Sequence, residues 1–557
     1  MLVPGVVGTA GLVGASLLTL APAETAGAAE TAIVRADSGI AWVSCEKFGF
    51  GGAGTDCGYL TVPRDWAKPG GTKIKLAISR VKATVAASKY QGVMLVNPGG
   101  PGGSGLQFSG LQGLLPNNSG NAYDWVGFDP RGVGDSQPAM SCIRDFASAQ
   151  HPPYVPGKKS KKPRRSERSW LKLSKKYATA CGEKYGDLLN HMHTTDWARD
   201  MDALRAALGA NQINYLGFSY GTYLGQVYAT MYPTHVRRML LDGNVDPRGV
   251  WYQAQLSQDR AFERVANQFF AWVAKNNATY KLGSAAGEVR AKYLAVVKSL
   301  RTHRENGIGA NEWTDTFVHA MYAESLWPDA AQAFAAWVRN HDMAPAEVAF
   351  KNSLDADDNV FAVYNAVQCT DTAWPQSYKT WRKDAFATAK QAPMLTWSNV
   401  WFNTACLYWP AKPARPVNVG GPVPMLLLNA TLDGATPYSG AVEVRRRFSA
   451  ARLVAEVGAT THAGSTLAGN PCIDKVVAAY LKTGALPTRK AGNDADVSCT
   501  RSPQPEPGLL PIDTAGVTLP DATSMANAPA SLPAPDPGPH PDQSLFDKIV
   551  GLLPSRR

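Results

Sequence analysis

Short apolar runs, separated by longer stretches with helical periodicity, predict a sheet with interleaved helices in this chain. The first two runs, residues 58–63 and 73–81, flank a Pro-Gly-Gly turn and predict two adjacent strands. Six later runs predict further strands, and the first three of these are apolar in the manner of strands buried on both faces. The six runs cover residues 92–96, 124–129, 213–217, 238–242, 423–429 and 452–457. Eight strands with helices between them indicate an α/β fold with a mostly parallel sheet and an antiparallel start.

A long insertion separates the sixth predicted strand from the seventh. It extends for about 170 residues, far more than an ordinary connection between two strands. Within it, residues 259–276 and 286–302 carry apolar positions at helical spacing, and tryptophans are concentrated there. We therefore expect a helical lid over the face of the sheet that carries the active site. The expected sheet core comprises residues 37–245 and 416–500, and the expected lid comprises residues 246–415.

The two ends of the chain have the composition of segments outside the folded core. Residues 1–29 contain an apolar run that is short for a membrane span, followed by the small-residue sequence Ala26-Gly27-Ala28, so we interpret them as an export signal. This signal lacks the usual positive start, since Arg35 is the first basic residue. The Pro-rich residues 501–557 predict a disordered tail. We expect a secreted protein with no membrane span after processing.

The net charge of +11 is concentrated in one segment. Residues 158–176 hold ten Lys or Arg against one acid, Glu167, and so carry +9 of that charge. The remainder is close to neutral, which gives no indication of nucleic-acid binding. With 45% hydrophobic and 18% charged residues, the chain has the composition of an ordinary globular protein. We interpret the basic segment as a solvated loop and helix face, and weak contact with an anionic polymer such as the cell wall is the alternative.

The cysteines agree with export. Their number is even, and they fall into four pairs of sequence neighbours, although eight cysteines allow about 105 pairings. The C-x-x-C spacing of zinc and redox sites does not occur, so we expect neither a metal nor a cofactor. The eight residues expected to form disulfides are Cys45, Cys57, Cys142, Cys181, Cys369, Cys406, Cys472 and Cys499.

The segment Gly217–Gly221 carries the strongest chemical signal. It has the pattern G-x-S-x-G, with the predicted strand 213–217 before it and apolar positions at helical spacing over residues 222–232 after it. In this context the two glycines permit a sharp strand-to-helix turn that exposes the serine hydroxyl at a helix N-terminus. We therefore predict that Ser219 is a nucleophile.

A serine nucleophile needs a base and an acid that orients the base. In α/β hydrolases the acid and then the histidine follow the serine, each after a late strand. Asp433 and His462 meet this requirement, because they follow the seventh and eighth predicted strands. Asp242 and Asp246, after the sixth strand, are the competing acids. We predict the triad Ser219, Asp433 and His462.

Donors for an oxyanion are expected from the Gly-rich loop at residues 97–105. Its spacing differs from that of a phosphate-binding G-x-x-x-x-G-K-[ST] loop, and no lysine follows. Glycine lets backbone N–H groups approach an acyl oxygen closely. We predict an oxyanion hole formed by Gly99, Gly100 and Tyr220.

Together these motifs resemble the secreted bacterial tripeptidyl aminopeptidases, which are serine exopeptidases related to proline iminopeptidases within the α/β hydrolases. The similarity extends from about Trp42 to Cys499, and Pro98 stands where proline iminopeptidases have a histidine. The resemblance assigns Ser219 as nucleophile, His462 as general base and acid, and Asp433 as its orienting acid. The motifs are residues 97–105, 127–136, 217–222, 433–437 and His462, together with all eight cysteines.

The resemblance also implies substrates with a free α-amino group, and so acids in the lid that pair with it. Glu324, Asp329 and Asp371 are the candidates. The expected function is that of a secreted serine aminopeptidase that releases tripeptides or similar short peptides. A proline iminopeptidase-like peptidase and an esterase or amidase acting on small molecules are the alternatives, and a non-catalytic binding role is a third.

Overall fold

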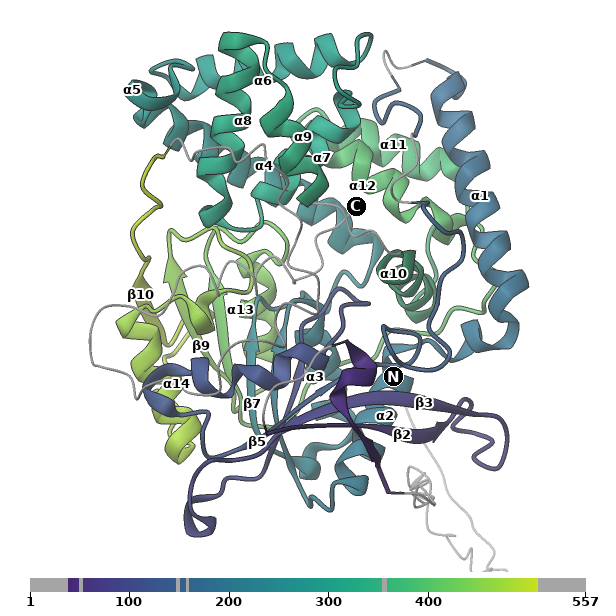
Figure 1. Cartoon of the computed structure of the whole chain (residues 1–557), viewed down its shortest axis with the longest axis vertical. Coiled ribbons are helices and arrows are strands. Elements are labelled where there is room, and N and C mark those ends of the chain that lie inside the picture. The colour runs from purple at the N-terminus through teal and green to yellow at the C-terminus, as the bar shows by residue number, and fades with distance from the viewer. Residues whose placement is uncertain (1–38, 50–53, 147–150, 157–159, 353–357, 509–557) are drawn as a thin grey trace, which may run out of the picture. The chain divides into compact units, whose positions relative to one another are not determined.

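The computed structural model describes residues 39–49, 54–146, 151–156, 160–352 and 358–508. The predicted export signal and most of the predicted tail lie outside these residues. A ten-stranded sheet has the order β1-β2-β3-β5-β4-β6-β7-β8-β9-β10 (Figure 1). Pairs from β1 to β5 are antiparallel and those from β5 to β10 are parallel. The strands are β1 (Ala41–Val43), β2 (Thr55–Pro63), β3 (Lys73–Val81), β4 (Val93–Asn97), β5 (Asp124–Phe128), β6 (Ile213–Phe218), β7 (Val236–Asp242), β8 (Leu426–Ala430), β9 (Arg452–Val457) and β10 (Val497–Thr500).

The α/β class, the antiparallel start and the parallel remainder agree with the sequence-based expectation, but the sheet has ten described strands where eight were expected. The additional strands are the two edges, β1 and β10. They have three and four residues, which is too short for a recognisable run of apolar positions. Each depends on its neighbour in the sheet, β1 on β2 and β10 on β9.

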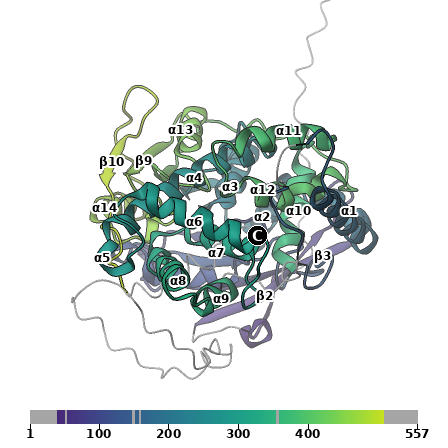
Figure 2. The same cartoon turned by 90° about the horizontal axis from the view of Figure 1, so that it is seen from above.

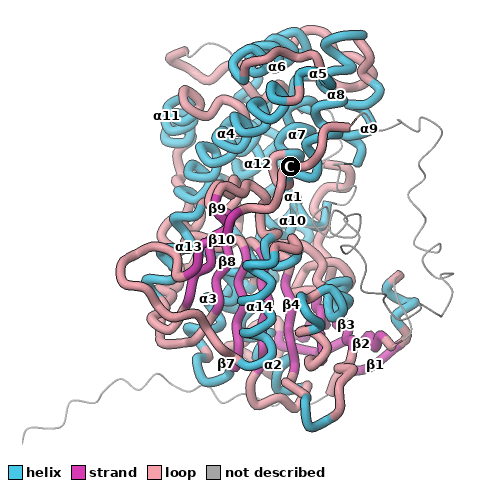
Figure 3. Tube along the Cα trace, turned by 90° about the vertical axis from the view of Figure 1, so that its left-hand side faces the viewer, coloured by secondary structure: helices cyan, strands magenta, loops and turns pink. Residues whose placement is uncertain are grey.

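Side chains of the central strands alternate between two hydrophobic cores, as the two-residue period of a strand requires. In β4, Val93 and Leu95 belong to one core, whereas Met94 and Val96 belong to the other. Helices therefore cover both faces of the sheet (Figure 3). The first face is covered by α2 (Thr194–Ala207), α3 (Tyr220–Met231) and α13 (Tyr438–Arg447), and the second by η3 (Leu106–Leu114) and α14 (Pro471–Thr483).

The lid is the helical segment between β7 and β8. It has an aromatic core of its own, in which Phe269, Trp313, Phe317 and Trp327 are buried. Figure 2 shows α4, α6 and α7 lying over the strands. Three lid helices, α10, α11 and α12, instead contribute buried residues to the core of the first sheet face. The lid helices are α4 (Tyr252–Lys275), α5 (Asn277–Tyr280), α6 (Ala286–Leu300), α7 (Ala310–Ala320), α8 (Trp327–Asn340), α9 (Ala344–Asn352), α10 (Asp358–Asp371), α11 (Tyr378–Thr388) and α12 (Thr396–Asn403), with the short turns η7 (Glu324–Leu326) and η8 (Thr404–Leu407).

The basic segment contributes most of its described residues to the loop before α1 (Arg165–Tyr185) and to the first half of that helix. Its cationic side chains from Lys161 to Lys176 are exposed, whereas Glu167 is buried and pairs with Arg382 of the lid at 2.5 Å. This arrangement fits a solvated helix face. Lys158 and Lys159 lie outside the described residues.

Four disulfides join the cysteines in sequence order. Every described cysteine is paired. Among the described residues, none of the helices combines the length and apolarity that a bilayer crossing requires. The pairs are Cys45–Cys57, Cys142–Cys181, Cys369–Cys406 and Cys472–Cys499.

A buried ion pair connects the first sheet face to α2. Arg131, in the loop after β5, donates from Nη2 and Nε to the carboxylate of Asp200 at 2.6 and 2.7 Å. Both side chains are fully buried. The guanidinium also donates to the carbonyls of Pro63 and Arg64, so it holds the end of β2 against the helix. Loss of either partner would leave an uncompensated buried charge.

We expect Asp200→Ala to lower the free energy of unfolding by about 3–5 kcal/mol, because it leaves the Arg131 guanidinium buried without its counter-ion. Denaturant unfolding followed by tryptophan fluorescence measures this. Arg199→Ala is the matched control, since Arg199 is 38% exposed and pairs with Asp196 at 2.9 Å. Arg199→Ala should lower the free energy of unfolding by less than about 1 kcal/mol. Equal losses in the two variants would contradict the assignment.

Candidate active site

Ser219 occupies a sharp turn between β6 and α3. Its backbone has φ 55° and ψ −125°, outside the ordinary helical and extended regions. The Ser219 N–H donates to the Asp242 carbonyl at 3.0 Å, and its own carbonyl accepts from the N–H of Thr222 at 2.8 Å. Neighbouring structure therefore holds the turn on both sides. This is the geometry expected of a nucleophile elbow.

The glycines around this turn allow backbone segments to approach closely. A Cβ on Gly217 would lie 2.6 Å from the Gly221 carbonyl oxygen, and one on Gly221 would lie 2.5 Å from the Asn97 carbonyl oxygen. Gly99 has φ 100°, and its Cβ would lie 2.9 Å from both Ser219 Cβ and Tyr220 N. The Gly-rich loop thus packs directly on the elbow. Side chains at Gly99 or Gly221 would separate the two, whereas a side chain at Gly217 would separate β6 from α3.

Two backbone N–H groups next to Ser219 are available for an oxyanion. The N–H groups of Gly100 and Tyr220 have no hydrogen-bond partner among the described residues, and both residues line the same cavity as Ser219. The predicted third donor differs, because the Gly99 N–H donates to Asn97 Oδ1 at 3.0 Å. The contribution of Gly99 is therefore close packing, and the geometry leaves Gly100 and Tyr220 as the candidate donors.

Asp129, to which sequence analysis assigned no role, holds the Gly-rich loop. It is fully buried, and its Oδ1 accepts from Ser104 Oγ at 2.6 Å and from the Gly105 N–H at 3.0 Å. Its Oδ2 accepts from the Asp135 N–H at 2.9 Å. Burial raises the pKa of Asp129 to about 7. The motif at residues 127–136 contains Asp129, but the residues that Asp129 binds, Ser104 and Gly105, lie in a different loop.

Asp433 and His462 form a buried pair on the loops after β8 and β9. His462 Nδ1 lies 2.9 Å from Oδ2 of Asp433 and 3.0 Å from Oδ1. Asp433 Oδ1 also accepts from the N–H groups of Ala435 and Thr436 at 2.8 Å each, and its Oδ2 accepts from Thr436 Oγ1 at 2.9 Å. These bonds fix the carboxylate, which can in turn orient the imidazole.

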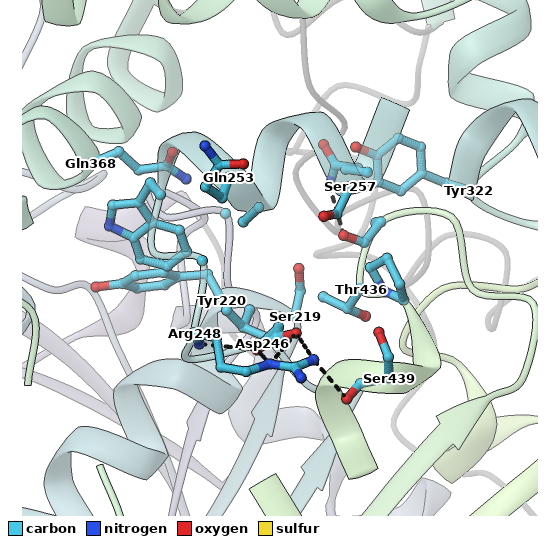
Figure 4. A pocket seen from close by; sticks show the side chains of 18 residues that line it. Ser219, Tyr220, Asp246, Arg248, Gln253, Ser257, Tyr322, Gln368, Thr436 and Ser439 are labelled. Atoms are coloured by element: carbon cyan, nitrogen blue, oxygen red, sulfur yellow. Dashed lines mark hydrogen bonds and ion pairs between the residues drawn. The ribbon is translucent and has the colours of Figure 1, made fainter. Parts of the chain in front are cut away.

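A shared cavity connects this pair to Ser219. Thr436, which hydrogen-bonds to Asp433, lines the cavity together with Ser219. Tyr322 of the lid also lines it, and its ring packs edge-on against the His462 imidazole with centroids 5.7 Å apart. Figure 4 shows Ser219 between Tyr220 on one side and Thr436 on the other, with Tyr322 beyond Thr436. The cavity that Ser219 lines is therefore bordered by residues that contact Asp433 and His462.

The cavity has a volume of about 280 Å³ and is covered by the lid. Gln253 and Ser257 of α4 lie over Ser219 (Figure 4), and Gln258 of the same helix also lines the cavity. Among the described residues that line it, the only charged ones are Asp246 and Arg248, which pair with each other at 2.5 Å. The wall is thus polar but neutral overall, with several side-chain amides. This size is near the lower end of the range for ligand pockets, about 300–1,000 Å³.

The three predicted substrate acids do not line the cavity. Glu324 is buried and hydrogen-bonded to Thr460, and Asp329 is exposed on the first turn of α8. Asp371 is nearest, because its carboxylate accepts from the indole N–H of Trp251, a lining residue, at 3.1 Å. Burial raises the pKa of Asp371 to about 6.

The two competing acids have other partners. Asp242 is fully buried and accepts from the N–H and hydroxyl of Thr466 at 2.7 Å each. Burial raises its pKa to about 7. Asp246 is held by Arg248. Asp433 is therefore the acid that the structure places on His462. Among the described residues, no group of three or more His, Cys, Asp or Glu could hold a metal ion.

The fold and the site are those of a known class. A family profile described as the alpha/beta hydrolase fold matches residues 92–462, which is more than half of the chain. The match extends from the start of β4 to His462 and includes Ser219 and Asp433. The chain belongs to the α/β hydrolase fold family.

Within that family the chain is similar to three curated proteins. It is 41% identical over 500 residues to the tripeptidyl aminopeptidase of Streptomyces coelicolor, covering 87% of this chain and 90% of the relative. It is 31% identical over 461 residues to the serine protease Hip1 of Mycobacterium tuberculosis, with coverages of 78% and 86%. It is also 31% identical over 458 residues to a protein of the same species named carboxylesterase B, with coverages of 77% and 85%. The chain is a serine hydrolase of the tripeptidyl aminopeptidase family, and the resemblance drawn from its motifs is confirmed.

We expect Gly99→Ala to abolish reaction of Ser219 with a serine-directed phosphonate, with a loss of at least about 100-fold in rate, because the added methyl displaces the loop that carries the oxyanion donor. The second-order rate of labelling, with mapping of the labelled peptide, measures this. Gly110→Ala is the matched control, since a Cβ there meets nothing within 4 Å. Unchanged labelling of a folded Gly99→Ala variant would contradict the packing argument.

Proposed function

We propose that the chain is a secreted serine aminopeptidase that releases tripeptides, or similarly short peptides, from free N-termini through an acyl-enzyme. The observation that carries the proposal is the 41% identity to a tripeptidyl aminopeptidase over nearly all of both chains. The elbow at Ser219, the pair of Asp433 and His462 and the neutral cavity under the lid all support it.

In the first half of the proposed reaction, Ser219 Oγ attacks the carbonyl carbon of the scissile bond. Nε2 of His462 takes the hydroxyl proton, while Asp433 holds Nδ1 and stabilises the imidazolium that forms. The oxygen of the tetrahedral intermediate accepts from the N–H groups of Gly100 and Tyr220. His462 then gives the proton to the leaving amine, and the C–N bond breaks.

In the second half, water replaces the leaving amine at His462. His462 removes a proton from that water, which attacks the ester carbonyl of the acyl-enzyme. The same two N–H groups bind the second oxyanion. Collapse of this intermediate returns the proton to Ser219 Oγ and releases the short peptide with a new carboxylate.

The lid accounts for the exopeptidase character of the proposal. Side chains of α4 and α10, including Gln253, Ser257 and Gln368, line the cavity near Ser219. They limit how many residues of a peptide fit on the acyl side of the scissile bond. Amide and hydroxyl oxygens at these positions can accept hydrogen bonds from peptide N–H groups and from an ammonium group.

Asp371 supplies the negative charge that favours a free amine in this proposal. Its carboxylate accepts from the indole of Trp251, which lines the cavity, and from Thr194, whose Oγ1 lies 2.7 Å from the Tyr220 hydroxyl. Above a pH of about 6 the carboxyl is ionised and attracts an ammonium group. As the pH falls through this value, the group takes up a proton and the attraction is lost.

An esterase acting on small molecules is the second candidate function. The 31% identity to a protein named carboxylesterase B favours it, since that relative has similar coverage to the serine protease Hip1. A serine triad hydrolyses esters and amides by the same steps. The two functions differ in whether peptide contacts beyond the scissile bond increase the rate.

Export is part of the proposal. Four disulfides in one chain fit an oxidising compartment outside the cytoplasm. The segment predicted as an export signal, residues 1–29, lies outside the described residues.

We expect a tripeptidyl p-nitroanilide with a free amine to be cleaved with a kcat/KM at least about tenfold above that of its N-acetylated form, because acetylation removes the ammonium charge. Ser219→Ala should lower kcat for either substrate by about 10⁴-fold or more. Release of nitroaniline and mass analysis of the peptide product measure both effects.

The matched control is a simple p-nitrophenyl ester of similar acyl length. Equal rates for the free and acetylated peptides would remove the amine-recognition part of the proposal. Hydrolysis of the ester with no cleavage of either peptide would replace the peptidase by the esterase. Label from a phosphonate at a residue other than Ser219 would overturn the triad.

We expect Asp371→Asn to reduce the preference for the free amine by about tenfold, because it removes one buried charge near the cavity. The ratio of kcat/KM for the free and acetylated substrates, measured from pH 5 to pH 8, tests this. In the unaltered chain the ratio should rise with pH through about 6, and in the variant it should not. Asp329→Asn is the control, because Asp329 is exposed and should leave the ratio unchanged. If folded Asp371→Asn keeps the kcat/KM ratio of the unaltered chain, Asp371 has no role in recognition of the free amine.

A further inference from the structure

A short segment of the lid is hydrogen-bonded to the loop that carries His462. The His462 N–H donates to the Tyr322 carbonyl at 2.8 Å, and the Glu324 N–H donates to Thr461 Oγ1 at 3.2 Å. Glu324 Oε1 accepts from the N–H and from the hydroxyl of Thr460, at 3.0 and 2.6 Å. Residues 322–324 of the lid and residues 460–462 of the sheet core therefore form one bonded unit, and Glu324 accepts two of its four hydrogen bonds.

The other carboxylate oxygen of Glu324 is bound by the chain after β10. Arg501 Nη2 forms an ion pair with Glu324 Oε2, and its Nη1 donates to the Gly458 carbonyl at 3.0 Å. The chain continues toward the lid, where the indole N–H of Trp272 donates to the Pro505 carbonyl at 3.2 Å. In Figure 1 this segment runs from β10 up to the lid helices. Arg501 thus contacts the histidine loop, residues 458–462, at two points, Gly458 directly and Thr460 through Glu324.

We propose that Glu324 is a positioning residue for His462, and that it couples the closed lid and the chain after β10 to the catalytic base. The Glu324 side chain is only 9% exposed, and its contacts are the ion pair with Arg501 and the hydrogen bonds from Thr460. A buried carboxylate with all its partners in place defines one geometry for the atoms it binds. These contacts hold the loop from Gly458 to His462. The residue that Glu324 binds, Thr460, is only two positions before His462 in sequence.

This role replaces the amine-binding role that the sequence suggested for Glu324. A substrate ammonium group would have to displace Arg501 or Thr460 from a carboxylate that does not line the cavity. The proposal rests on the serine chemistry proposed above, since it concerns the base of that reaction. It makes lid closure part of the assembly of the base, because Tyr322, which also lines the cavity, holds the His462 backbone.

The test compares Glu324→Ala, Glu324→Gln and Arg501→Met in the full chain. Glu324→Gln removes the charge but keeps an oxygen that can accept from Thr460, whereas Glu324→Ala removes both. Arg501→Met removes the ion pair and leaves the carboxylate. Arg290→Met is the control, because Arg290 pairs with Glu263 at 2.9 Å within the lid and has no contact with the histidine loop. We measure kcat and KM for the free tripeptidyl substrate, the rate of phosphonate labelling at Ser219, and the thermal midpoint.

We expect Glu324→Ala to lower kcat and the labelling rate by about 10- to 100-fold, since a small displacement of a catalytic group has an effect of this size, while KM changes by less than about threefold. Glu324→Gln should recover most of this loss, to within about tenfold of the unaltered chain. The kcat and labelling rate of Arg501→Met should lie between those of Glu324→Ala and Glu324→Gln. Arg290→Met should lower the thermal midpoint and leave kcat unchanged.

A Glu324→Ala variant that keeps the kcat and labelling rate of the unaltered chain would overturn the proposal, as would a loss confined to KM, which would restore a substrate-binding role. If Glu324→Ala does not fold, the proposal is tested by Glu324→Gln and Arg501→Met. An unchanged rate of phosphonate labelling at Ser219 in both variants would overturn the proposal. Labelling separates this proposal from the proposed function. An unaltered chain that is labelled at Ser219 but cleaves no peptide contradicts the peptidase, while the labelling rates of the variants still test the positioning of His462.

Discussion

The close contact between the Gly-rich loop and the nucleophile elbow is the constraint on which the rest of the site depends. Ser219 adopts a backbone conformation that few residues other than glycine occupy, and it is held there by bonds to the strand beside it. The loop can reach the elbow only because Gly99 and Gly221 have no side chains. This contact places two N–H groups near the serine hydroxyl before any substrate is bound, so little reorganisation remains for the reaction itself. Asp129 stabilises this loop through its hydrogen bonds to Ser104 and Gly105.

The lid contacts the candidate active site in two places. One of its segments binds the backbone of His462, and another supplies the amide side chains above Ser219. The acid that orients the imidazole, in contrast, is held entirely by its own loop through Ala435 and Thr436. The base is therefore supported from two sides, by Asp433 from the sheet core and by Tyr322 from the lid. A substrate that alters the lid would thus also affect the base, which links recognition to turnover.

Local sequence patterns predicted eight of the ten described strands and the residues of the candidate triad. The elbow is recognisable because strand, turn and helix adjoin within 20 residues of Ser219, and Asp433 and His462 are recognisable because each follows a strand. The remaining features depend on contacts between distant segments. Glu324 lies 136 residues from Thr460 in sequence and 177 from Arg501, so no spacing rule distinguishes it from an amine-binding acid. The edge strands, likewise, exist because a neighbour is there to pair with them.

The bonded unit of residues 322–324 and 460–462, together with Gly458 and Arg501, has a consequence for recombination among relatives. A lid exchanged at its two junctions with the sheet, after β7 and before β8, would carry Tyr322 and Glu324 from the donor but leave the histidine loop and Arg501 from the recipient. In such a chimera, the residues on the two sides of each contact near the His462 imidazole would come from different proteins. Exchange of substrate preference by lid transfer therefore requires that the segment from Gly458 to Arg501 move with the lid, although more than 30 residues of sheet and linker separate the two in sequence.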